Sequence, residues 1–263
     1  MLTEVIYPIL FTFGLAVGSF LNCLIYRLEI DSKPTGRSFC PSCKHKLSWK
    51  DLIPLFSYLS LKGRCRYCGK KISFQYPLVE IATGILFLLV GINLNPVLAL
   101  DHLRLVLTLA VFSLLVVVFV YDLRHFIIPN KIIYPVIFVT LALLVSKSFL
   151  ASDYSLILNN IITGAIVFLS FLAIYLLSRG KGIGFGDVRY AFFMGLFLGF
   201  PEVLVGLFLS FVIGAIIGVT FIILGRKGRK DMIPFGPFLV FGTVTAYLYG
   251  SELINLYLDL ILI

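Results

Sequence analysis

Charged residues are scarce in this sequence: they make up 13% of its 263 residues, whereas hydrophobic residues make up 60%. The apolar residues fall in long blocks with short polar loops between them. Because about 20 apolar residues cross the hydrocarbon core of a bilayer, each long block predicts a transmembrane helix. We therefore expect an all-α polytopic membrane protein with about eight transmembrane helices, near residues 4–26, 77–92, 103–121, 131–148, 157–178, 188–200, 202–224 and 236–258. The second and sixth blocks are short, so counts of seven or six helices stay open.

The first eleven residues lack lysine and arginine and include Glu4. A secretory signal peptide begins with positive charge, so this segment is interpreted as a retained helix with its N-terminus outside. With eight helices, 20 of the 22 lysine and arginine residues fall on one side of the membrane, and the other side keeps only Arg104 and Lys147. The positive-inside rule makes the basic side cytoplasmic.

The net charge of +9 is concentrated between Arg27 and Lys71, where 11 residues are basic and 3 are acidic. One interpretation is anchoring against anionic membrane lipid. The other is nucleic-acid binding, which the pattern disfavours because the basic residues surround cysteines and form no stripe interleaved with aromatic residues. We expect membrane lipid and no nucleic acid as a partner.

The chain has a single sizeable polar segment, residues 28–76, and four of its five cysteines lie there. They form two Cys-x-x-Cys pairs whose surroundings repeat at an offset of 25 residues. Four thiolates satisfy a tetrahedral zinc ion, so we expect a small cytoplasmic zinc-ribbon-like insert between helices 1 and 2. Two disulfides are the alternative, which a reducing cytoplasm disfavours. The expected Zn²⁺ ligands are Cys40, Cys43, Cys65 and Cys68, and Cys23 is expected to be a small buried hydrophobic residue.

Two aspartates stand at the ends of long apolar blocks, where charge is costly and often functional. Asp122 is followed by Pro129, which should break the helix, and Asp187 follows the glycine-rich segment 180–186. Structural roles are open for both: Asp122 as a boundary residue paired with Arg124 or His125, and Asp187 as a helix N-cap.

Glycine-rich backbone at membrane depth needs protein or a water-filled cavity around it. We therefore expect Gly184 and Gly186 to form an active-site loop beside Asp187. Two facing carboxylates in a wet pocket are the parts of an aspartic protease, because one activates water while the other protonates the leaving amide.

Asn22 lies in the first apolar block, on one helical face with Gly14, Gly18 and Ser19. The glycines permit close helix packing. An amide in hydrocarbon needs a hydrogen-bonding partner, so Asn22 is either a structural residue or a polar contact of the active site.

With these motifs the chain resembles type IV prepilin peptidases of the GxGD class of intramembrane aspartic proteases. The resemblance covers nearly the whole chain. It rests on residues 18–22 with Arg27, both cysteine pairs, 52–54, 63–66, Tyr76-Pro77 with Glu80, Asp122 with Ile128-Pro129, 184–187 and Pro234-Phe235-Gly236-Pro237.

The resemblance implies that Asp122 and Asp187 are catalytic and that the substrates are prepilin or pseudopilin precursors, which lose a short basic leader on the cytoplasmic side of the inner membrane of a prokaryote. Members with the four-cysteine insert are often bifunctional and methylate the new N-terminal residue, usually phenylalanine, with S-adenosylmethionine. The sequence lacks a glycine-rich nucleotide fingerprint, so the methyl donor rests on the resemblance and the insert. Asn130 and Arg189 depart from the family pattern, where aspartate and lysine are frequent.

The implied organisation has three parts: residues 1–95, with the insert 28–76; the peptidase domain 103–224; and a C-terminal helix 233–263. Two alternatives stay open. A non-enzymatic zinc-bearing factor that docks pilin precursors would tolerate loss of either aspartate. A proton-coupled transporter would favour internal repeats and charges near the bilayer midplane, and the sequence shows neither.

Overall fold

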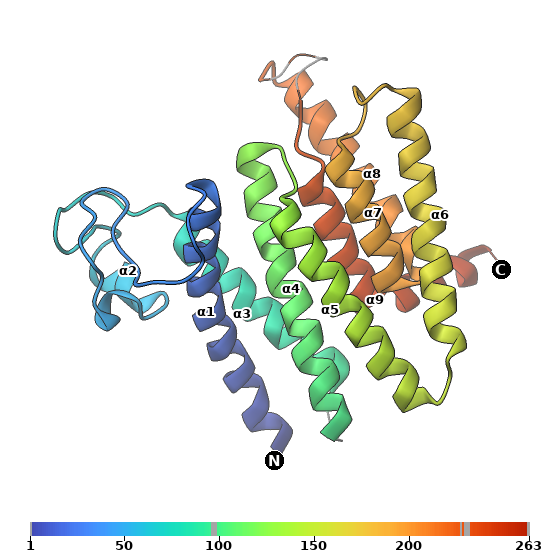
Figure 1. Ribbon diagram of the computed structural model, residues 1–263, viewed down its shortest axis with the longest axis horizontal. Helices are drawn as coiled ribbons and strands as arrows, with labels where there is room; N and C mark the ends of the chain where they lie inside the picture. Colours follow the sequence, from blue (N-terminus) through green and yellow to red (C-terminus); the bar gives the residue numbers. More distant parts are fainter. Residues whose placement is uncertain (1, 96–98, 227, 229–231, 262–263) are drawn as a thin grey trace. The chain divides into compact units, whose positions relative to one another are not determined.

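The computed structural model describes residues 2–95, 99–226, 228 and 232–261. These residues form nine α-helices and one short 3-10 helix, in agreement with the predicted all-α fold (Figure 1). Their order is α1 (Leu2–Glu29), η1 (Trp49–Asp51), α2 (Phe56–Ser60), α3 (Gln75–Leu94), α4 (Ala99–His125), α5 (Asn130–Ala151), α6 (Ser155–Leu177), α7 (Phe185–Leu198), α8 (Glu202–Ile223) and α9 (Gly236–Ile261). The chain divides into two compact units, Met1–Val97 and Leu98–Ile263.

In the first unit, α1 packs along α3 (Figure 1). Two glycines of α1 make the close contact possible. A Cβ added at Gly14 would lie 2.8 Å from the Cα of Gly84, and one added at Gly18 would lie 2.7 Å from the Cα of Glu80. Small residues let two helix backbones approach in lipid, so the predicted packing role of these glycines is confirmed.

The segment between α1 and α3 is the polar insert, which carries η1 and α2. It contains two hairpin-like turns, each closed by an isolated antiparallel bridge, Phe39 with Lys46 and Arg64 with Lys71. The two bridges are 25 residues apart along the chain, which is the offset of the sequence repeat.

The second unit contains α4 to α9. The short helix α7 packs against α5, α6, α8 and α9, and most of its side chains are fully buried. A helix that is apolar all round belongs in an interior. Close approach to α6 depends on Gly195, whose added Cβ would lie 2.7 Å from the Cα of Gly164. The C-terminal helix α9 packs on α8 and α4 within the same unit.

Six helices of the described part of the chain are long and apolar enough to cross a membrane: α1, α3, α4, α5, α6 and α8. A multi-pass membrane protein is therefore confirmed, but the count of eight spans is not. The remaining two predicted blocks are also helical. However, α7 has only 14 residues, and α9 contains polar residues such as Thr243, Thr245 and Glu252 that dilute its apolar character.

Candidate functional site

Asp122 and Asp187 line one cavity of about 280 Å³ in the second unit. Asp122 lies in the last turn of α4, and Asp187 lies in the first turn of α7. The loop between α4 and α5 completes the wall. The remaining lining residues are Phe126, Ile127, Ile128, Pro129, Asn130, Gly184, Phe185, Gly186 and Arg189. Helix α5 begins at Asn130 directly after Pro129, so the predicted break at the proline is confirmed.

Asp122 is almost fully buried, with 4% of its surface exposed. Its Oδ2 accepts a hydrogen bond of 2.9 Å from the backbone N–H of Gly236, the first residue of α9. Free N–H groups at the start of a helix favour a negative charge nearby. The start of α9 therefore stabilises the Asp122 carboxylate, although the two lie far apart in the sequence.

Gly236 was missed as a site residue by the sequence-based prediction. A Cβ added at this position would lie only 2.6 Å from Oδ2 of Asp122, so the close approach requires glycine. Its signal in the sequence is the motif Pro234-Phe235-Gly236-Pro237, because a proline in the first turn marks a helix start.

Asp187 is the third residue of α7, and its Oδ2 accepts a 3.1 Å hydrogen bond from the backbone N–H of Gly184. The N-cap is Gly184, so the alternative that Asp187 itself is the N-cap is wrong. The predicted glycine loop also needs correction, because Gly186 lies inside the helix. A Cβ at Gly186 would lie 3.1 Å from that of Ile128, so glycine lets the start of α7 pack against the loop after α4.

Asn130 and Arg189, the two departures from the family pattern, contact each other. The Arg189 guanidinium donates a hydrogen bond to Oδ1 of Asn130, and both residues line the cavity. The guanidinium also lies 4.6 Å from the ring centre of Phe185, at cation–π distance. The two departures therefore form one local pair that places a positive charge in the wall around the carboxylates.

Each carboxylate is thus held by a main-chain N–H on one oxygen, and the pair faces a shared cavity. Two carboxylates at one site tend to share a proton, because like charges that close cannot both ionise easily. Such a pair can act as general base and general acid in the same reaction.

The four insert cysteines come together in the first unit. Their Sγ atoms all lie within 4.8 Å of one another, and those of Cys40 and Cys68 are 4.0 Å apart. Four sulfurs around one tetrahedral zinc at about 2.3 Å stand about 3.8 Å apart, so this donor set fits such an ion. All five cysteines of the chain are free of disulfides.

Matching backbone hydrogen bonds shape the two cysteine turns. The N–H of Lys44 donates a 2.9 Å hydrogen bond to the carbonyl of Cys40. The N–H of Gly69 donates one of the same length to the carbonyl of Cys65. Lys44 and Gly69 also share a left-handed backbone, with φ of 57° and 68°. The predicted repeat is therefore a structural one, in which each turn presents one buried and one exposed thiol.

Asp51 ties the insert together beside the cysteines. Its carboxylate forms a 2.7 Å ion pair with Arg66 and accepts hydrogen bonds from Ser48 and from the Tyr67 hydroxyl. Burial raises the pKa of Asp51, but these donors outweigh burial and lower the pKa from 3.8 to about 2. The ring of His45 packs on the ring of Tyr67, and their centroids are 3.7 Å apart.

Asn22 is buried in the first unit. Its side-chain amide donates to the carbonyls of Tyr76 and Gly18, and its oxygen accepts from Gln75. These bonds tie α1 to the start of α3 and support the structural interpretation, while a role at the carboxylate pair stays a prediction. Cys23 was expected to be buried but is only partly buried, and its Sγ lies 3.8 Å from the Ser38 hydroxyl.

Comparisons with known proteins agree over most of the chain. Residues 12–94 match the model of the bacterial peptidase A24 N-terminal domain, and residues 109–219 match that of the type IV leader peptidase family. The chain is 36% identical to a Bacillus subtilis protein named prepilin leader peptidase/N-methyltransferase, over 97% of this chain and 98% of that protein. Proteins of the same name from Aeromonas hydrophila and Legionella pneumophila are 31% and 30% identical, over 96% of this chain in both cases and over 93% and 94% of their own lengths. No solved structure matches. This chain belongs to the type IV leader peptidase family.

Proposed function

We propose that this chain is an intramembrane aspartic endopeptidase that removes the basic leader of type IV prepilin-like proteins and then N-methylates the new N-terminal residue. The names of its relatives support both activities. The observation that carries the peptidase assignment is that Asp122 and Asp187, from separate helices, line one cavity.

In the cleavage step, one carboxylate takes a proton from water as the water oxygen attacks the scissile carbonyl carbon. The other carboxylic acid gives its proton to the amide nitrogen as the C–N bond breaks. The N–H groups of Gly236 and Gly184 hold Oδ2 of Asp122 and of Asp187 in place, which leaves Oδ1 of each for proton transfer. Asp122 and Asp187 are thus the catalytic pair, and Gly184, Gly186 and Gly236 position them.

We assign a structural Zn²⁺ to Cys40, Cys43, Cys65 and Cys68. Their convergence supports this assignment, as does the small number of buried apolar side chains in the insert. Below about 40 to 60 residues a segment holds few core contacts, so metal binding supplies folding free energy directly. S-adenosylmethionine supplies the methyl group of the second reaction.

The basic loops support an orientation with the insert and the carboxylate pair on the cytoplasmic side of the inner membrane and with the N-terminus outside. The substrates are prepilin or pseudopilin precursors, whose basic leaders lie on that same side.

The test is a reaction of purified protein in detergent with a prepilin, with release of the leader followed by mass spectrometry. We expect Asp122→Asn and Asp187→Asn to lower cleavage by at least about 1,000-fold, because each removes a proton-transfer group. The matched control is Asp259→Asn, an exposed aspartate of α9, which should cleave like the wild type. Unchanged cleavage by both site variants would contradict the peptidase assignment and leave a non-enzymatic docking factor.

A further inference from the structure

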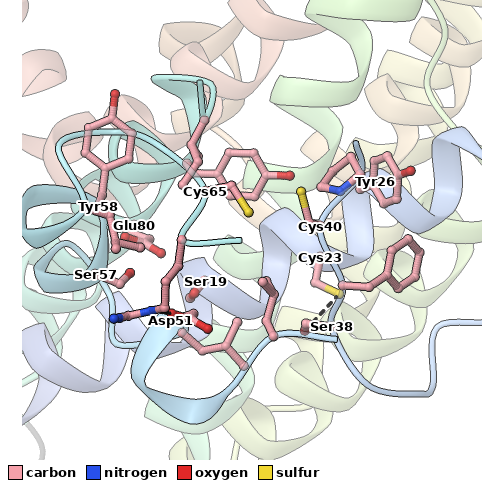
Figure 2. Close-up of a pocket in the computed structure, with 18 of the residues that line it drawn as sticks. Ser19, Cys23, Tyr26, Ser38, Cys40, Asp51, Ser57, Tyr58, Cys65 and Glu80 are labelled. Atoms are coloured by element: carbon pink, nitrogen blue, oxygen red, sulfur yellow. Dashed lines mark hydrogen bonds and ion pairs between the residues drawn. The ribbon is translucent and has the colours of Figure 1, made fainter. Parts of the chain in front are cut away.

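The first unit contains a cavity of about 130 Å³. None of the residues that line it takes part in the proposed cleavage mechanism. It lies between the second half of α1, the insert and the start of α3, and it reaches the cysteine turns (Figure 2). Most of its wall is apolar or aromatic, contributed by Tyr26, Phe39, Leu47, Leu52, Tyr58, Leu61, Ile72 and Tyr76. Figure 2 shows Glu80 and Ser57 on one side of it, and Cys23 and Ser38 on the other.

Glu80 is the unexplained residue of this wall. It is 6% exposed, and its Oε2 accepts a 2.8 Å hydrogen bond from the backbone N–H of Leu55, while the Ser19 hydroxyl also bonds the carboxyl group. Within the described part of the chain, Glu80 forms no ion pair. A buried carboxylate without a cation costs free energy, which a cationic ligand would recover.

The two arginines of the wall are engaged elsewhere. The Arg27 guanidinium donates to the main-chain carbonyls of Pro34, Gly36 and Arg37. Arg66 forms the ion pair with Asp51. Glu80 is therefore the charged group of this cavity that is left for a ligand.

The backbone around Glu80 is built to hold it there. Leu55, which donates to the carboxylate, has φ of +59° and ψ of −49°, a positive-φ conformation that is rare and strained for a leucine. Gly18 of α1 lets that helix press against the Cα of Glu80. Strain and close packing that persist around one buried charge indicate a functional site.

We infer that this cavity binds the methyl acceptor, the free α-amino group and hydrophobic first residue of the processed pilin-like protein, with Glu80 as counter-charge and proton acceptor. The inference rests on the methylation activity proposed above. An ammonium group complements the buried carboxylate, and the apolar wall complements the side chain beside it. The cavity is well below the ~300 Å³ or more that pockets for drug-sized ligands enclose, so it suits one residue better than the larger methyl donor.

The chemical step follows from this placement. The α-ammonium gives one proton to Glu80, and the neutral amine then attacks the methyl carbon of S-adenosylmethionine. The new N–C bond forms as the C–S bond breaks. The electron pair of the C–S bond stays on sulfur, which yields S-adenosylhomocysteine. The product is the N-methylammonium terminus, and Glu80 returns its proton to water.

The experiment uses the full-length, zinc-loaded protein, S-adenosylmethionine and a peptide with the mature N-terminus, so that cleavage is not required. For Glu80→Gln we expect methyl transfer to fall about 100-fold near neutral pH, with prepilin cleavage and equilibrium binding of radiolabelled S-adenosylmethionine unchanged. The difference in methylation rate between wild type and Glu80→Gln should shrink above pH about 8, where the α-amino group is deprotonated without a protein base. The other titratable groups that line the cavity are the same in the wild type and in Glu80→Gln, so the difference between the two proteins isolates this residue. They are Cys23, Tyr26, Arg27, Cys40, Asp51, Tyr58, Cys65, Arg66 and Tyr76.

The matched control is Glu29→Gln, a carboxylate of α1 outside the cavity lining, which should methylate at the wild-type rate. A second variant, Ser57→Leu, narrows the cavity while keeping the carboxylate of Glu80, and it should raise the acceptor KM while leaving donor binding and cleavage unchanged. Ser57→Leu keeps the test decisive if the Glu80→Gln protein fails to bind zinc or shows no cooperative thermal unfolding.

Two outcomes overturn the inference alone: wild-type methylation by Glu80→Gln together with an unchanged acceptor KM in Ser57→Leu, or loss of donor binding in Glu80→Gln, which would assign the cavity to the donor. If the wild type cleaves prepilin but never methylates the mature peptide, the proposed methylation fails first, and this site fails with it.

Discussion

At the scale of single residues, the position of the Asp122 carboxylate depends on the absence of a side chain at Gly236. We predict that Gly236→Ala lowers kcat for leader cleavage about 100-fold, because the new Cβ would stand 2.6 Å from Oδ2 and push the carboxylate aside. The backbone N–H that binds Asp122 remains, so the fold should lose only about 1 to 3 kcal/mol. Cleavage kinetics and thermal unfolding in detergent measure the two effects separately.

Gly218 of α8 is the matched control for that substitution. A Cβ there would come no closer than 3.4 Å to a neighbour, the flexible end of Ile233. Gly218→Ala should therefore keep both activity and stability. Equal kinetics for the two alanine variants would show that Asp122 does not depend on the contact with Gly236.

Asp51 gives a pH-dependent prediction for the insert. Its pKa is lowered from 3.8 to about 2, so the folded protein binds this proton more weakly than the unfolded chain does. The resulting stabilisation is complete above pH about 4 and is lost as pH falls towards 2. Because Arg66 is half exposed, we expect about 1 to 2 kcal/mol rather than the full value of the shift.

We therefore predict that Asp51→Asn weakens hydrogen-exchange protection of the insert amides by that amount at neutral pH. The difference between wild type and variant should disappear near pH 2. Loss of metal at acid pH affects both proteins alike, so comparison at each pH isolates the carboxylate. A difference that stays constant down to pH 2 would rule out the ion pair as its cause.

At the scale of elements, the contact between α1 and α3 depends on glycine. We predict that Gly18→Ala destabilises the first unit by about 1 to 3 kcal/mol, because its Cβ would meet the backbone of Glu80 at 2.7 Å, where no flexible side chain can yield. Exchange protection of α1 and α3 should fall while that of α7 is kept. Gly69→Ala, in a turn with open space but with φ of +68°, controls for backbone strain without a helix contact.

The helices and the cysteine turns were predictable because their signals are local. Apolar blocks predicted the positions of α1 and α3 to α9, and a repeat of 25 residues predicted the two cysteine turns. The start of α7 was misplaced by three residues, at 188 instead of Phe185. Glycines at 184 and 186 suggest open backbone, whereas Gly184 caps the helix and Gly186 lies inside it.

The rest of the candidate site depends on contacts between distant parts of the chain. The bond from Gly236 to Asp122 joins residues 114 apart, and the bond from Arg189 to Asn130 joins residues 59 apart. No periodicity or motif spacing encodes which helix start meets which carboxylate. The role of Glu80 was hidden for the same reason, since its burial depends on Gly18 and Leu55 together.

At the scale of the whole molecule, the two candidate reactions belong to separate compact units. The four cysteines and Glu80 lie in Met1–Val97, and the aspartate pair lies in Leu98–Ile263. Each unit has its own helix packing. Damage to the metal site should therefore act on one reaction more than on the other.

We predict that removal of zinc with a chelator abolishes methylation and leaves cleavage within about threefold of wild type. The proposed Zn²⁺ would supply the free energy that holds the two cysteine turns together, so its loss should open the wall of the Glu80 cavity, which includes Cys40 and Cys65. Cys43→Ser together with Cys68→Ser, which removes the two exposed ligands, should reproduce the effect. Restored methylation on adding Zn²⁺ to the chelated wild type, but not to the double variant, ties the effect to this site. Loss of cleavage in parallel with methylation would mean that the peptidase also depends on the folded insert.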